Sequence, residues 1–183
     1  MATHVPATIE DLYQMPKHTK AEIIDGAVVA MSPTGFWPSR ASGEIYASLR
    51  DYERQTKAGY AIPDNAGFIV NLPNRLSFSP DAAFYTGPLT GMKFLEGAPV
   101  FAAEVRSAGD YGPQAEREIV QKRADYFAAG ALVVWDVDLL GEDVVRVYRL
   151  NEPDKPVVYR RDELTEAEPA VPGWTMAVND LFT

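Results

Sequence analysis

The chain has 183 residues, of which 46% are hydrophobic and 23% charged, the balance of an ordinary folded domain. This length accommodates one well-buried core and is short for two, so we expect a single domain over residues 1–183. No apolar run reaches the ~20 residues of a membrane-spanning helix, and the N-terminus lacks the basic and apolar segments of a secretory signal. Cysteine is absent, which excludes disulfides and thiolate metal sites and favours a cytoplasmic location.

The formal net charge of −9 argues against a nucleic-acid partner, because phosphate-binding proteins usually display a basic face. It does not exclude such a partner, because net charge is a sum over the whole surface and a metal site concentrates carboxylates locally. His4 and His18 stand near the N-terminus, and we expect both to be exposed and outside any site.

The first quarter of the chain predicts a short helix, a hairpin and a long helix. Thr8 followed by Asp11 is typical of a capped helix start. The apolar segments 21–24 and 27–31 flank an Asp-Gly pair, a strong signal for a two-residue hairpin turn. Residues 39–57 contain no proline and carry apolar side chains at helical spacing, so they predict a helix.

The middle of the chain predicts strands around loops. Segments 68–72 and 76–85 are expected to be strands that bracket a turn at residues 73–75. The glycine-rich stretch 87–97 predicts a surface loop. The apolar run 99–105 that follows contains a carboxylate near its end, and we expect it to be a buried strand.

The last part of the chain completes a sheet with helices. Pro113 suits the first turn of a helix, and Gly130 suits its end. Segment 131–137 is almost wholly apolar and predicts a central strand covered on both faces, paired with a strand at 144–150. The fold class is therefore mixed α/β (α+β), a central mixed sheet flanked by helices, with an N-terminal β-hairpin.

Two carboxylates lie in predicted strands. Asp81 lies inside segment 76–85, where an unpaired charge is costly to bury, and Glu104 follows three apolar residues. Carboxylates at the ends of neighbouring strands can share a hard divalent cation such as Mg²⁺ or Mn²⁺. The backbone carbonyl of Val105 is a further candidate ligand.

A lysine on the next predicted helix completes the candidate site. Lys122 and Tyr126 are four residues apart and lie on the same helix face. A lysine ammonium near a divalent cation would position a water and offset negative charge that develops on phosphorus, so the set suits phosphodiester hydrolysis. Ordinary structural interpretations remain open, because Glu104 could pair with Arg106 and Lys122 with Glu118.

The order of these motifs resembles a restriction-endonuclease family expanded in cyanobacteria, a branch of the PD-(D/E)XK nuclease superfamily. The similarity runs over nearly the whole chain. The motifs that carry it are Glu22-Ile-Ile-Asp25-Gly26, Met31-Ser32-Pro33, Pro80-Asp81-Ala82, Glu104-Val105-Arg106-Ser107, Lys122 to Tyr126, Gly130, Pro172-Gly173-Trp174 and Leu181-Phe182.

The resemblance implies a restriction endonuclease-like fold, a Mg²⁺-dependent nuclease that acts on DNA, and a homodimer. Asp81 and Glu104 match the acidic metal ligands. The superfamily lysine two residues after the second acid is Arg106 here, and in this family the lysine comes from the following helix, which points to Lys122. Arg106 would hold a phosphate rather than act as a base, because a guanidinium stays protonated. Glu22 matches a frequent acidic position and would line the site together with Tyr126.

Two family features are changed, and two other functions stay open. The chain has no histidine shortly after the Ser-Pro segment, and Glu118 stands where an aspartate is usual. These changes and the negative charge leave room for a non-catalytic, dimeric binding protein on a nuclease fold. A metal-dependent hydrolase of a small phosphorylated substrate is the third possibility, because it would need no basic face.

Overall fold

A computed structural model describes residues 5–17 and 19–183. His4 and His18, expected to be exposed, lie outside these described residues. Within the described ranges, no helix combines the length and the apolar character that crossing a bilayer requires.

The described residues form three α-helices, a terminal 3-10 helix and thirteen strands. The helical elements are α1 (Ile9–Tyr13), α2 (Phe36–Thr56), α3 (Pro113–Ala128) and η1 (Val178–Phe182). The strands are β1 (Lys20–Ile24), β2 (Ala27–Met31), β3 (Tyr60–Pro63), β4 (Phe68–Ile69), β5 (Ser77–Phe78), β6 (Ala82–Tyr85), β7 (Leu95–Glu96), β8 (Phe101–Val105), β9 (Val133–Val137), β10 (Val145–Arg149), β11 (Glu152–Tyr159), β12 (Leu164–Glu166) and β13 (Thr175–Ala177).

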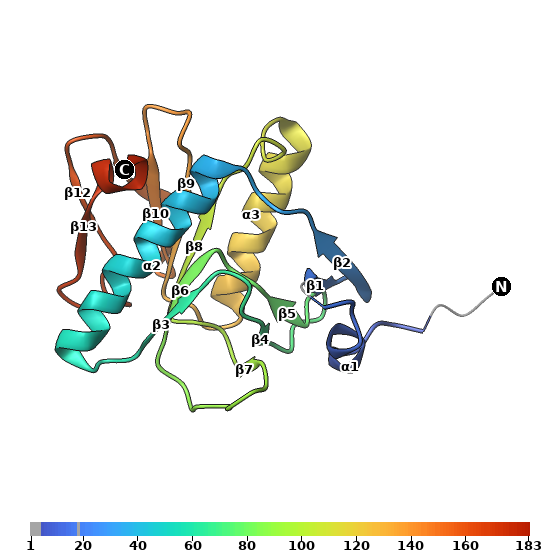
Figure 1. Cartoon of the computed structure of the whole chain (residues 1–183). Coiled ribbons are helices and arrows are strands. Elements are labelled where there is room, and N and C mark those ends of the chain that lie inside the picture. The colour runs from blue at the N-terminus through green and yellow to red at the C-terminus, as the bar shows by residue number, and fades with distance from the viewer. Residues whose placement is uncertain (1–4, 18) are drawn as a thin grey trace.

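A six-stranded mixed sheet in the order β11-β10-β9-β8-β6-β3 forms the centre of the molecule. Strands β8 and β9 run parallel, and the other neighbours in this sheet are antiparallel. Parallel strands need a crossover, and α3 supplies it between β8 and β9. Helix α2 lies in front of the sheet and α3 behind it (Figure 1). The predicted fold class is confirmed.

Each face of the sheet packs against one helix. Ile45 and Leu49 of α2 join a buried cluster with Phe101 and Trp135 of the sheet. Tyr126 and the following Phe127 of α3 join the cluster on the other face. Val133, Trp135 and Val137 of β9 join the first cluster and Val134 the second, and all residues of β9 are buried, as predicted for a central strand. Each face of the sheet is therefore packed against one helix.

The N-terminal hairpin is present as predicted and forms a separate two-stranded sheet. Asp25 and Gly26 both have positive φ values, 49° and 73°, as the favoured two-residue hairpin turn requires. The hairpin contacts the segment before β5, because the Leu76 N–H donates to the Ile23 carbonyl at 3.0 Å. Ile23 is fully buried, which fixes one face of β1 against the rest of the molecule.

The predicted strand at 76–85 is wrong in one respect, because it is divided into β5 and β6. Between them, the Ser79 N–H donates to the Glu22 carboxylate and Pro80 has no N–H to donate. The Asp81 N–H still donates to the Ala103 carbonyl of β8 at 3.1 Å. The interruption therefore places Asp81 beside β8 and gives Glu22 a backbone donor.

Candidate functional site

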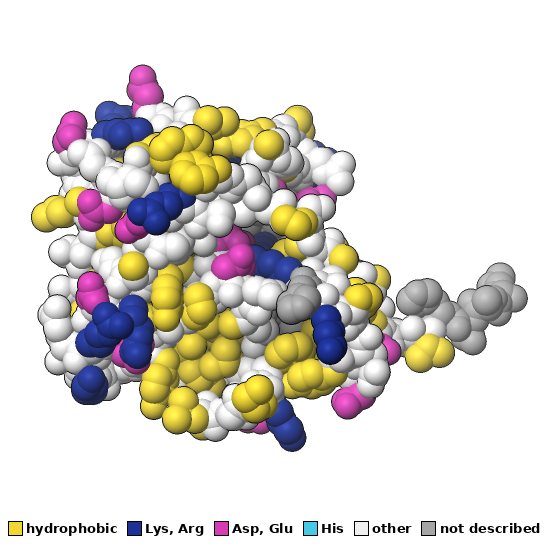
Figure 2. Space-filling model, in the orientation of Figure 1, with side chains coloured by type: hydrophobic (Ala, Val, Ile, Leu, Met, Phe, Trp, Pro, Cys, Tyr) yellow, Lys and Arg dark blue, Asp and Glu magenta, His cyan; other side chains and the backbone are white. Residues whose placement is uncertain are grey.

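The structure brings five of the predicted site residues together where β1, β6, β8 and α3 meet. Glu22 comes from β1, Asp81 precedes β6, Glu104 lies on β8, and Lys122 and Tyr126 come from α3. Figure 2 shows side chains of both charges beside a hollow in the centre of the face, next to the hairpin. We call these five residues together with Lys20 the acid–lysine cluster.

Glu104 stands at the centre of the cluster. Its Oε2 atom accepts a hydrogen bond from Lys122 Nζ at 2.9 Å, and its Oε1 atom accepts one from the Tyr126 hydroxyl at 2.6 Å. Burial raises the pKa of Glu104 to about 7, against the opposing effect of Lys122, and the nearby charges of Asp81 and Glu22 add to the increase. A carboxyl that titrates near neutrality is typical of functional sites.

Lys122 is held between two carboxylates. Its Nζ atom lies 2.9 Å from Glu104 Oε2 and 3.1 Å from Glu22 Oε1, and no ion pair joins it to Glu118 in the described residues. Burial opposes the charged form, but Glu104 and Glu22 outweigh it and raise the Lys122 pKa well above its usual value. Lys122 is therefore an ammonium ion at neutral pH and cannot act as a base there.

Asp81 is held by one lysine and one backbone amide. Its Oδ1 atom lies 2.8 Å from Lys20 Nζ, and its Oδ2 atom accepts a hydrogen bond from the Val105 N–H at 2.8 Å. Lys20 also pairs with Asp64 at 2.6 Å. Burial alone would lower the pKa of Lys20, but the negative charges of its partners, of which Asp81 has the largest effect, raise it above its usual value. Each of the two carboxylates predicted to bind metal thus carries a lysine ammonium.

A network of buried ion pairs joins the cluster to Arg75 and Asp125. Glu22 has only 2% of its side chain exposed and pairs with Arg75 as well as Lys122. The Arg75 Nε atom in turn donates to Asp125 Oδ2 at 2.8 Å. Burial would raise the Glu22 pKa, but Lys122 and Arg75 together hold it below its usual value. Glu22 is therefore ionised and fixes the position of Lys122.

Arg106, predicted to join the site, does not contact the cluster in the described structure. Its Nε and Nη2 atoms donate to the two oxygens of Asp136 at 2.7 Å each, and it also pairs with Glu116. The guanidinium of Arg106 is therefore occupied by Asp136 of β9, whereas Asp81 precedes β6, on the other side of β8. The phosphate-holding role of Arg106 stays a prediction.

Sequence reasoning missed Lys20 and Arg75. Lys20 and Glu22 are two residues apart on β1, and side chains at that spacing lie on the same face of a strand. Once Glu22 is assigned to the site, this alternation could have identified Lys20. Arg75 gave no comparable signal, because it lies in the turn before β5 and meets Glu22 only when the hairpin docks.

The residues of the cluster fit a divalent cation in chemistry, although the described residues contain no ready group of three His, Cys, Asp or Glu donors. Asp81 and Glu104 offer hard oxygen donors, and their side chains are 22% and 26% exposed. Each carboxylate is paired with a lysine ammonium, a point charge, rather than with the bidentate fork of an arginine. A divalent cation at this position would replace a lysine as the counter-charge of each carboxylate.

The Glu104 pKa predicts how cation binding depends on pH. A cation bound by Glu104 would compete with the proton on this carboxyl, so its affinity would reach its full value well above pH 7 and fall as pH drops through that value. Between pH 8 and pH 6 we expect Mn²⁺ affinity to fall about tenfold. Calorimetric titration at the two values measures this change, and an equal affinity at both would show that Glu104 is not a ligand.

Comparison with known proteins agrees with this architecture. The model of the Uma2 family, described as putative restriction endonuclease, matches residues 9–179. A crystal structure of a putative nuclease belonging to DUF820 from Anabaena variabilis superposes with a TM-score of 0.75, at 17% identity, over 97% of this chain and 98% of that one. No curated protein matches the sequence at a significant level. The chain therefore belongs to the Uma2 family of putative restriction endonucleases.

Proposed function

We propose that the protein is a divalent-metal-dependent endonuclease that hydrolyses DNA phosphodiester bonds. The observation that carries this proposal is the joint position of Asp81, Glu104 and Lys122 in one partly exposed cluster. The family description supports a nuclease, and two carboxylates beside a lysine are the groups that metal-assisted phosphoryl transfer uses.

Asp81, Glu104 and the Val105 carbonyl would hold one Mg²⁺ or Mn²⁺ ion. The Val105 N–H already faces Asp81, and the N–H and C=O of one strand residue point to the same side. When bound, the ion would polarise a phosphoryl oxygen and lower the pKa of a nearby water.

Lys122 would act on the substrate itself. As a cation anchored by Glu22, it would donate hydrogen bonds to the attacking water and to the phosphoryl oxygen on which charge develops. Tyr126 would fix the rotamer of Glu104 through the hydrogen bond to its Oε1 atom. Lys20 would be released from Asp81 to meet the phosphate backbone, because a cation would replace it as counter-ion.

DNA is the substrate that the family description favours. On the face in Figure 2, basic side chains are interspersed with acidic ones rather than gathered into one strip. DNA would therefore be held by local contacts near the cluster rather than by a long-range positive field. The homodimer that the resemblance implies stays a prediction, which light scattering would test.

The proposal is tested by replacing Asp81 with asparagine, which keeps the side-chain shape and removes the charge. We expect Mn²⁺ affinity in Asp81→Asn to fall at least about tenfold, with plasmid nicking lost in parallel. Calorimetric titration of Mn²⁺ and a supercoiled-plasmid assay measure the two effects. Asp51→Asn is the matched control, because Asp51 lies on α2 with 67% of its side chain exposed.

The outcomes separate the alternatives. Mn²⁺ binding that depends on Asp81 without nicking would favour a small phosphorylated substrate. A wild type that binds no Mn²⁺, even with DNA present, would contradict the enzyme proposal. The specific observation in favour of a non-catalytic protein is that lysines already neutralise both carboxylates.

A further inference from the structure

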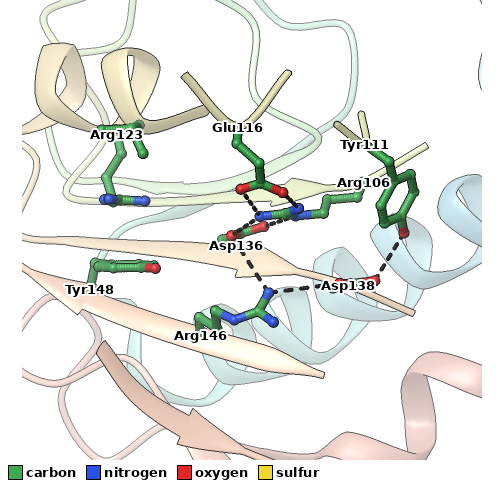
Figure 3. Close-up of a pocket in the computed structure, with 9 residues that line it drawn as sticks. Arg106, Tyr111, Glu116, Arg123, Asp136, Asp138, Arg146 and Tyr148 are labelled. Atoms are coloured by element: carbon green, nitrogen blue, oxygen red, sulfur yellow. Dashed lines mark hydrogen bonds and ion pairs between the residues drawn. The ribbon is translucent and has the colours of Figure 1, made fainter. Parts of the chain in front are cut away.

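A polar cavity lies between α3 and the strands β9 and β10, and no residue of the acid–lysine cluster lines it. Its volume is about 360 Å³, within the range of small-molecule sites. Three arginines and three carboxylates line it, so their formal charges cancel: Arg106, Arg123, Arg146, Glu116, Asp136 and Asp138. Figure 3 shows Arg123 and Arg146 at two edges of the group around Asp136.

The three carboxylates of this cavity are already satisfied. Arg106 donates two hydrogen bonds of 2.7 Å to Asp136 and also forms an ion pair with Glu116. Asp138 accepts hydrogen bonds from the Tyr111 hydroxyl at 2.9 Å and from two backbone N–H groups of the β9–β10 turn. The cavity therefore offers no set of free carboxylates to a cation, in line with the absence of a three-donor group in the described residues.

Two of the arginines keep unused donors. Arg123 is 9% exposed, and its guanidinium carbon lies 3.7 Å from the centre of the Tyr148 ring, but no acceptor in the described residues hydrogen-bonds it. Arg146 Nη1 lies 3.8 Å from both Asp136 and Asp138, which is beyond hydrogen-bonding distance. Their unbonded nitrogen atoms reach solvent at the cavity, so they are open to an acceptor that enters it.

We propose that Arg123 and Arg146 form an anion site that binds a phosphate group, either of a free nucleotide or of a nucleic-acid backbone. The planar fork of a guanidinium matches phosphate oxygens, and stacking on Tyr148 holds the Arg123 fork in one plane. Because the formal charges of the lining cancel, hydrogen-bond geometry rather than net charge drives binding. This proposal goes beyond the nuclease assignment and does not depend on it.

The test titrates inorganic phosphate, deoxyadenosine monophosphate and a short DNA duplex into the protein in EDTA, at constant ionic strength. EDTA removes divalent cations, so the outcome is independent of whether the acid–lysine cluster binds metal. We expect Arg123→Gln and Arg146→Gln each to weaken binding at least about tenfold. Arg117→Gln, an exposed residue of the same helix, is the matched control and should bind as the wild type does.

The three ligands distinguish the sources of the phosphate. Binding of the mononucleotide that depends on both arginines would identify a nucleotide site. Duplex binding that depends on them, without mononucleotide binding, would identify a backbone contact. Arg146 is partly exposed, so its replacement keeps the test valid if Arg123→Gln fails to fold. A wild type that binds none of the three ligands, or equal binding by all variants, would overturn the proposal.

Discussion

Lys122→Met is expected to reduce plasmid nicking by about 100- to 1,000-fold while Mn²⁺ binding persists. The methionine keeps the length of the side chain but removes the ammonium that would stabilise charge on the phosphoryl group. Cation affinity should not fall, because the ammonium that now neutralises Glu104 competes with the metal. Nicking rates and calorimetric titration of Mn²⁺, made on the same preparation, give the two quantities.

The pattern separates a role of Lys122 in chemistry from a role in folding. Lys122→Arg keeps the positive charge beside Glu22 and Glu104 and should retain more activity than Lys122→Met. Far-ultraviolet circular dichroism would establish that both variants are folded. Nicking at the wild-type rate in Lys122→Met would remove Lys122 from the mechanism, and loss of Mn²⁺ binding would assign it to structure alone.

Arg75→Met is expected to lower the free energy of unfolding by about 3–5 kcal/mol. Arg75 is the shared partner of Glu22 and Asp125, and all three side chains are at most 5% exposed. Without the guanidinium, two carboxylates are left in a buried site with one fewer positive charge. Urea unfolding, followed by fluorescence, measures the change in free energy.

The pH dependence of this loss identifies its origin. Removing Arg75 takes away one of the charges that lower the Glu22 pKa, so this pKa rises in the variant. In the variant, protonation of Glu22 removes the buried negative charge at a higher pH. The difference in unfolding free energy between the wild type and Arg75→Met should therefore shrink as pH falls. Arg54→Met is the control, because its pair with Asp51 is exposed and is worth less than about 1 kcal/mol. A loss of unfolding free energy in Arg75→Met as small as the loss in Arg54→Met would contradict the prediction.

Sequence patterns were sufficient for the parts of the fold with strong local signals. The hairpin follows from Asp25-Gly26, and β9 follows from an apolar run that can only be buried. Strands β3 and β11 gave no such signal, because they are the two edges of the sheet. An edge strand tolerates polar residues and proline, and β11 contains Pro153 and Pro156.

The part of the site that could be predicted from the sequence is the part that depends on residue types and their order along the chain. Asp81 directly precedes β6, Glu104 lies on the neighbouring strand β8, and Lys122 lies on the helix that follows β8. Lys20 shares a face of β1 with Glu22 and could have been found from it, whereas Arg75 meets Glu22 only through the docking of the hairpin, a tertiary contact that no local pattern encodes. The pairing of Arg106 with Asp136 also arises only when β8 and β9 are neighbours.

The separate sheet of the N-terminal hairpin has a consequence for local stability. The hairpin contributes Lys20 and Glu22 to the cluster, yet it adds no strand to the six-stranded sheet. Proteins open locally in units whose free energies lie below that of global unfolding, and we expect the hairpin to be one of them. Its transient release would leave the main core intact while Asp81 and Lys122 each lost a partner. Hydrogen exchange of the β1 amides would then show a lower opening free energy than exchange of the β9 amides.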